Sequence, residues 1–196
     1  ALLEAKQERR VTKAGQVNEL EKPFIVQAPP NPIEQEGTYP LPEAQLDRFM
    51  FNLFVDYPSI EEEIEIVKQT TINREVQLDS VLSGEEIVYF QNLIRKVDVT
   101  DNVISYAVNL VNKTRINTPH ASDEIKELIT WGAGPRASQY LVLAAKALAV
   151  LRGKYSPDIQ EVQDVATSVL RHRIVASFTA DAEGITTEDI VQKLMA

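Results

Sequence analysis

The feature that most constrains this chain is a change of pattern near Pro58. After that residue, apolar side chains recur at the three- and four-residue spacing of amphipathic helices, almost to the C-terminus. Helices are predicted to begin near Ser59, Ser83, Thr100, Ser122, Pro135, Ser156 and Thr187. The helix from Ser122 is predicted to continue to about Trp131. The first two starts have a glutamate three residues later, which completes a capping box. Short amphipathic helices with short connections predict a compact all-α domain over residues 58–196.

Residues 1–57 have a different pattern, in which short apolar runs are separated by turn residues. Ala14-Gly15 lies between two β-prone runs and predicts the tip of a hairpin. The runs 24–28 (FIVQA) and 50–55 (MFNLFV) are mostly apolar, which favours strands buried on both faces of a parallel sheet. Between them, Pro42 predicts the start of a short helix that ends near Arg48.

Composition excludes several classes of function. With 20 Lys plus Arg against 29 Asp plus Glu, the formal charge is −9, which argues against a broad surface for nucleic acid or anionic membrane. The chain has no cysteine, so disulfides and thiolate metal sites are impossible. Its 2 histidines lie far apart in sequence and have no pattern of metal ligands around them, so we expect no metal site.

We also predict a cytoplasmic protein that does not associate with membranes. The most apolar stretch is far shorter than the roughly 20 residues that a membrane-spanning helix needs. The first ten residues, ALLEAKQERR, lack the apolar core of a signal peptide and have the pattern of the middle of an amphipathic helix. We therefore expect the chain to be a piece of a longer protein.

Three polar residues are candidates for a functional site. Asn31 follows the predicted strand 24–28 after two prolines, and ligands of α/β sheets bind just past such strand ends, although Asn before Pro is also common in turns. Arg48 ends a predicted helix, where the helix dipole alone favours a cation. Arg136 lies in the first turn of a helix, where the dipole disfavours a cation by roughly 0.3–1 kcal/mol. A nearby anion would reverse that penalty, so Arg136 is the clearest indication of a phosphate ligand.

Four strings in the chain resemble the MoxR family of AAA+ ATPases. The longest is 31–49 (NPIEQEGTYPLPEAQLDRF), which is similar to the signature of that family. The others are 131–139 (WGAGPRASQ), similar to the lid motif, 170–174 (LRHRI), similar to the last block of the family, and 1–12 (ALLEAKQERRVT), similar to the segment after the Walker B strand. The resemblance implies that residues 1–57 are an α/β remnant of a P-loop AAA+ core, consisting of a hairpin plus two core strands. It implies that residues 58–196 are the all-α AAA+ lid domain.

The resemblance also implies roles for the three candidate residues. Asn31 matches sensor 1, which helps to orient the attacking water beside the terminal phosphate. Arg48 matches the arginine finger, which acts in trans by reaching into the nucleotide site of the neighbouring subunit. Arg136 matches sensor 2, which binds the nucleotide from the lid. The hairpin at 11–22 would face substrates or the central pore.

The sequence contains neither a P-loop nor a Walker B pair. No segment fits G-x-x-x-x-G-K-[ST], and the resemblance places both motifs upstream of Ala1. ATP or ADP and Mg²⁺ are therefore expected as cofactors of the parent protein, and neither is expected to bind tightly to this chain alone. We expect this chain alone to be inactive in ATP hydrolysis.

The function implied by the resemblance is that of a chaperone-like ATPase. Such a protein would form a homo-oligomeric ring, with a hexamer as the expected size, and remodel or mature partner proteins, for example during cofactor or metal insertion. A protein with a von Willebrand factor A domain is a further expected partner. An alternative is a catalytically inactive interaction module that binds a partner or caps a ring. A helicase-type motor on DNA is a third interpretation, which the charge of −9 and the lack of a basic stripe disfavour.

Overall fold

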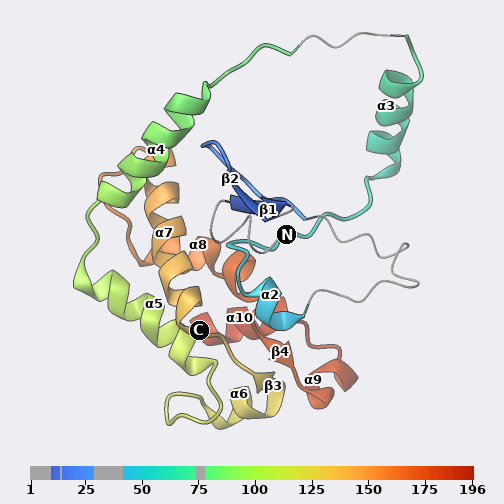
Figure 1. Ribbon diagram of the computed structural model, residues 1–196. Coiled ribbons are helices and arrows are strands. Elements are labelled where there is room, and N and C mark those ends of the chain that lie inside the picture. The colour runs from blue at the N-terminus through green and yellow to red at the C-terminus, as the bar shows by residue number, and fades with distance from the viewer. Residues whose placement is uncertain (1–9, 14, 29–41, 74–77) are drawn as a thin grey trace.

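The computed structural model describes residues 10–13, 15–28, 42–73 and 78–196 (Figure 1). Asn31 lies outside these residues. The elements are β1 (Arg10–Lys13), β2 (Gln16–Glu19), α2 (Glu43–Leu46), α3 (Ile60–Thr70), α4 (Gly84–Lys96), α5 (Asp101–Lys113), α6 (Asp123–Leu128), β3 (Ile129–Trp131), α7 (Pro135–Leu151), α8 (Ile159–Leu170), β4 (Val175–Ala176), α9 (Phe178–Ala182) and α10 (Thr187–Met195).

The predicted hairpin is confirmed. β1 and β2 pair antiparallel, with Arg10 opposite Glu19 and Lys13 opposite Gln16. Gly15 at the tip has φ +80°, a left-handed conformation that glycine adopts without strain. All four residues of β2 are exposed to solvent, so the hairpin projects from the surface.

The two predicted core strands are not formed. Neither 24–28 nor 50–55 has strand geometry, and Leu53, Phe54 and Val55 are 74%, 76% and 88% exposed. A strand that is apolar on both faces needs a neighbouring strand on each side and a layer above and below it. The described part of the chain supplies no such neighbours to either segment, so the apolar pattern has nothing to pack against.

The helical pattern after Pro58 is confirmed, with corrections at three boundaries. Ser59 and Ser83 form the expected capping boxes. The helix expected near Ser156 is capped instead by Asp158, whose side chain forms a capping box with Glu161. The last helix is capped by Thr186, one residue earlier than predicted.

The third correction concerns the helix predicted to continue to Trp131. It ends at Leu128, and Ile129–Trp131 forms β3, which pairs antiparallel with β4. The run Ile-Thr-Trp is β-branched and aromatic, which favours a strand. Because β4 comes from a segment about 45 residues later, this pairing is decided by tertiary structure, and the local helical pattern did not predict it.

The hydrophobic core of the described residues lies between α5, α7, α8 and α10. α7 packs along α8 and α5, and α10 packs on α8 (Figure 1). All buried side chains of the described residues fall between Val103 and Leu194, with Leu141, Val162, Leu170 and Ile190 among the most enclosed. α3 has no buried residue and stands apart from these helices. Among the described helices, none combines the length and the hydropathy that crossing a membrane requires.

A buried carboxylate joins the end of α7 to the start of α8. The side chain of Glu161 is 0% exposed, and its Oε1 accepts from Lys154 Nζ at 2.7 Å and from Arg152 Nη1 at 3.0 Å. Its Oε2 accepts from the backbone N–H of Asp158 at 2.8 Å. The hydrogen bond from Lys154 is the main reason that the pKa of Glu161 falls to about 2.

Candidate functional site

The turn Asp47-Arg48-Phe49-Met50, which follows α2, is held against the helical domain by side chains. Arg173 Nη2 donates to the Asp47 carbonyl at 2.7 Å and also to the Phe49 carbonyl, and Nη1 donates to the Met50 carbonyl at 3.4 Å. The Tyr140 hydroxyl donates to the Arg48 carbonyl at 3.3 Å. His172 Nε2 lies 3.0 Å from the Phe49 carbonyl oxygen. Carbonyls at a helix C-terminus have no partners within the helix, and here the helical domain supplies them.

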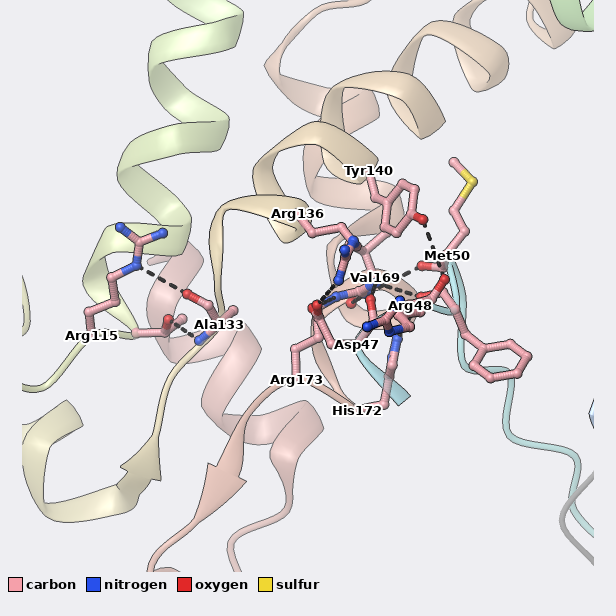
Figure 2. Close-up of polar contacts among 12 residues, drawn as sticks. Asp47, Arg48, Met50, Arg115, Ala133, Arg136, Tyr140, Val169, His172 and Arg173 are labelled. Atoms are coloured by element: carbon pink, nitrogen blue, oxygen red, sulfur yellow. Dashed lines mark hydrogen bonds and ion pairs between the residues drawn. The ribbon is translucent and has the colours of Figure 1, made fainter. Parts of the chain in front are cut away.

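The carboxylate of Asp47 joins this turn to two arginines (Figure 2). Its Oδ1 accepts from Arg173 Nε at 3.0 Å, and its Oδ2 pairs with Arg136 Nη1. The three side chains differ in exposure, since Arg173 is 1% exposed, Asp47 29% and Arg136 38%. One carboxylate therefore links the end of α2, the first turn of α7 and the segment that follows α8.

Arg173 is a buried charge, and its surroundings explain how it is tolerated. Burial is the main cause that lowers the pKa of Arg173, whereas the hydrogen bond and charge of Asp47 raise it. The guanidinium carbon also lies 5.1 Å from the centre of the Tyr140 ring, within the range of a cation–π contact. A buried cation is stable only when its donors are paired, and the turn and the end of α8 together supply the acceptors.

The loop that leads to Arg136 is fixed on the C-terminal end of α5. Thr114 Oγ1 accepts from the backbone N–H of Ala133 at 2.9 Å, and Arg115 Nε donates to the carbonyl of Ala133 at 3.1 Å (Figure 2). Gly132 allows this approach, because a Cβ at that position would lie 2.0 Å from the Thr114 carbonyl oxygen. α7 therefore starts at a fixed place, and Arg136 is presented from its first turn.

The structure tests the local surroundings of two of the three candidate residues. Arg136, which the sequence predicts to bind a phosphate, pairs here with the carboxylate of Asp47, and its phosphate-binding role stays a prediction. Arg48 follows Asp47 directly, so the structure places Arg48 and Arg136 in one cluster. Arg48 is half-buried, and within the described residues its Nη1 is enclosed without a hydrogen-bond acceptor. Asn31 lies outside the described residues, so its placement stays a prediction.

Sequence reasoning did not assign a role to Asp47, Tyr140 or Arg173. Arg173 lies in the string 170–174, just after a predicted helix, and the helix dipole alone accounts for a cation at that place. No local signal distinguished it, because Arg171, His172 and Arg173 are three consecutive polar residues and nothing in the sequence shows which of them is buried. Its partner is 126 residues away in sequence, so the pairing had no local signature.

The charges of this cluster fit an anionic ligand. Arg48, Arg136 and Arg173 carry three positive charges against the one negative charge of Asp47, in a chain whose formal charge is −9. Arginine binds phosphate oxygens through a planar fork of donors. In the described ranges, no group of three or more His, Cys, Asp or Glu side chains is arranged to hold a metal ion. The described residues therefore give this cluster a net positive charge.

Comparisons with known proteins agree with the lid fold. The model of the ATPase family associated with various cellular activities (AAA) matches residues 1–51, and the AAA lid domain model matches residues 121–194. The chain is 38% identical to the chaperone MoxR1 of Mycobacterium tuberculosis over 195 residues, which is 100% of this chain and 52% of that protein. It is 38% identical over 197 residues to the uncharacterised protein YeaC of Bacillus subtilis, of which 59% is covered.

A solved structure gives the same result. The fold matches a crystal structure of a candidate ATPase from Cytophaga hutchinsonii with a TM-score of 0.90 and 35% identity, over 99% of this chain and 59% of that one. The two matched models define an AAA-type ATPase segment with its lid. The chain therefore matches both AAA family models and is similar over its whole length to MoxR-type AAA+ ATPases. It spans 52% and 59% of the lengths of the two curated relatives described above.

Proposed function

We propose that this chain is the sensor, arginine-finger and lid portion of a chaperone-like ATPase that couples ATP hydrolysis in a ring to the remodelling of partner proteins. The observation that carries the proposal is the cluster around Asp47, in which Arg136 of the lid and the turn bearing Arg48 share one carboxylate. The similarity to a protein named as a chaperone supports the remodelling function.

Each candidate residue has a defined task in this proposal. Arg136 binds phosphate oxygens of the nucleotide from the lid, and exchanging Asp47 for a phosphate keeps its guanidinium paired. Arg48 acts in trans, where its guanidinium stabilises the charge of the transferred phosphoryl group, an effect worth about 10³–10⁵ in rate. Asn31 orients the attacking water. The P-loop and the ligands of Mg²⁺ belong to the rest of the ATPase, so this chain alone does not turn over ATP.

The domain assignment and the partners complete the proposal. Residues 1–57 belong to the AAA+ core and 58–196 form the lid domain. The ring is a hexamer, the protein is cytoplasmic, and a protein with a von Willebrand factor A domain is one of its partners. These points rest on the resemblance of the four sequence strings to the family.

Measurement of ATP turnover by the full-length protein tests the proposal. The wild-type protein is expected to hydrolyse ATP with Mg²⁺, and Arg48→Ala is expected to abolish hydrolysis while nucleotide affinity stays nearly constant. Mixing Arg48→Ala with a P-loop-defective variant should restore part of the activity, because mixed rings contain some intact composite sites. Assembled mixtures that never recover activity contradict the trans role of Arg48, and a wild-type protein without hydrolysis contradicts the proposed function as a whole.

A further inference from the structure

Arg173 directs most of its donors at the turn that bears Arg48. Nε and Nη2 donate only to that turn, to the Asp47 carboxylate and to the carbonyls of Asp47 and Phe49. Nη1 is shared between the carbonyls of Met50 and Val169. The guanidinium is therefore a link between the last turn of α8 and the turn Asp47-Arg48-Phe49-Met50 (Figure 2).

The hydrogen bonds to this turn fix the backbone on both sides of Arg48. The peptide plane before the Arg48 Cα contains the Asp47 carbonyl, which Arg173 holds at 2.7 Å. The plane after it contains the Arg48 carbonyl, which accepts from the Tyr140 hydroxyl at 3.3 Å. Because peptide units are planar, holding both carbonyls restricts the only two soft dihedrals at Arg48. The direction in which the Arg48 side chain leaves the backbone is then fixed.

The short helix before this turn does not position Arg48 well by itself. α2 has four residues, none of them buried, and helices this short are marginal without tertiary contacts. The segment 51–57 forms no strand and is exposed except at Asn52, whose N–H donates to the Ser168 carbonyl at 2.9 Å. Arg48 thus depends on contacts from the helical domain, and Arg173 makes the largest number of them.

We infer that Arg173 is a positioning residue for Arg48, and that Tyr140 assists it through the Arg48 carbonyl. The inference rests on the proposed role of Arg48 as arginine finger. Arg173 itself touches neither nucleotide nor water in this account. It holds the turn so that the Arg48 guanidinium reaches the phosphate in the neighbouring subunit, and it couples the lid of one subunit to the active site of the next.

The test uses steady-state ATP hydrolysis by the full-length protein with Arg173→Met, Arg173→Lys and Tyr140→Phe. Misplacing a catalytic group by about 1 Å costs about 10²-fold in rate, so Arg173→Met should lower kcat by about that factor while KM changes by less than about twofold. Arg173→Lys should recover only part of the loss, because an ammonium cannot reproduce the fork of donors. Tyr140→Phe, which removes a single hydroxyl, should lower kcat by a few-fold.

Arg171→Met is the matched control. Arg171 lies two residues away and pairs with Glu188 of α10 at 3.2 Å, so its loss removes an equal charge without touching the turn. Its kcat should equal that of the wild type. The decisive comparison uses Arg48→Lys, which keeps a positive charge and therefore some turnover. The double variant Arg48→Lys with Arg173→Met should be slower than Arg48→Lys by much less than the effect of Arg173→Met alone, because residues that act through one another are not additive.

Three results would overturn the inference while leaving the proposed function intact. One is a wild-type kcat in Arg173→Met. Another is a rise in KM without a fall in kcat, which would assign Arg173 to nucleotide binding. The last is a double variant slower than Arg48→Lys by the full effect of Arg173→Met. Should Arg173→Met fail to assemble, as judged by circular dichroism and size, Tyr140→Phe decides, and an unchanged kcat in that variant contradicts the inference. Absence of hydrolysis in the wild type would instead remove the proposed function, and the inference with it.

Discussion

The turn Asp47–Met50 and the segment 51–57 are neighbours in sequence, yet they differ in how they contact the helical domain. The turn contains two charged side chains, and side chains of the helical domain donate hydrogen bonds to each of its carbonyls. The following segment is more apolar, but Leu53, Val55 and Tyr57 are 74%, 88% and 90% exposed. Apolar side chains alone are therefore not enough to hold a segment against the helical domain. A short piece of backbone without regular structure is ordered here by a buried cation whose donors match its carbonyls.

Removal of the carboxylate from the turn should give the largest effect on stability. Asp47→Ala leaves Arg173 buried without its charged partner, which is expected to cost about 3 kcal/mol, since breaking a buried pair typically costs 3–5 and Asp47 is partly exposed. Leu53→Ser is the control from the exposed segment and should change stability by less than about 0.5 kcal/mol. Urea unfolding of this chain measures both. Equal losses in the two variants would remove the distinction between the turn and the segment.

The approach of the Arg136 loop to α5 gives the next largest effect. Gly132→Ala places a methyl group 2.0 Å from the Thr114 carbonyl oxygen, so the loop must shift, at an expected cost of about 2 kcal/mol. Gly134→Ala is a matched control, because a Cβ there meets nothing within 4 Å. Thermal unfolding of the two variants checks the prediction. A Gly132→Ala protein as stable as Gly134→Ala would mean that the loop is not held against Thr114.

The ion pairs of Glu161 should contribute a smaller, pH-dependent stability. Because its folded pKa is lowered to about 2 from the ordinary 4.5, the contribution is fully present above about pH 4.5 and is lost as the pH falls toward 2. Glu161→Gln should cost about 1.5 kcal/mol at pH 7, and the difference from the wild type should shrink across that acid range. Unfolding free energies measured from pH 7 to 2.5 test this. A difference that stays constant with pH would show that the carboxylate charge is not involved.

The sequence predicted the structural features that depend on residues close together in the chain. It missed the features that depend on contacts between residues far apart in the chain. The capping boxes at Ser59 and Ser83, the hairpin around Gly15 and the helix that begins at Pro135 all follow from residues within a few positions of one another. The penalty for a cation at the start of α7 indicated an anion near Arg136, which the sequence analysis assigned to a phosphate ligand. That the anion in the structure is Asp47, 89 residues earlier, is a consequence of the tertiary fold.

The same limit explains the errors. Residues 24–28 and 50–55 have the composition of buried strands, but a strand forms only when a neighbouring strand pairs with it. The composition of a segment does not show whether such a neighbouring strand is present. Ile129–Trp131 became a strand because β4 lies beside it. Arg173 is separated by more than 120 residues from the turn that it holds, so no window of sequence could have paired the two.

Hydrogen exchange on this 196-residue chain tests the central claim most directly. The amides of Asp47, Phe49 and Asn52 donate to Glu43, Leu46 and Ser168 at 2.9 Å each, and should be protected, whereas Leu53, Phe54 and Val55 should exchange at nearly unprotected rates. In Arg173→Met, protection at 47–52 should fall while that of α7 and α8 persists. Exchange at 47–52 that is as fast as at 53–55, or that is unchanged by Arg173→Met, would contradict the claim that the helical domain holds the turn of Arg48 through Arg173.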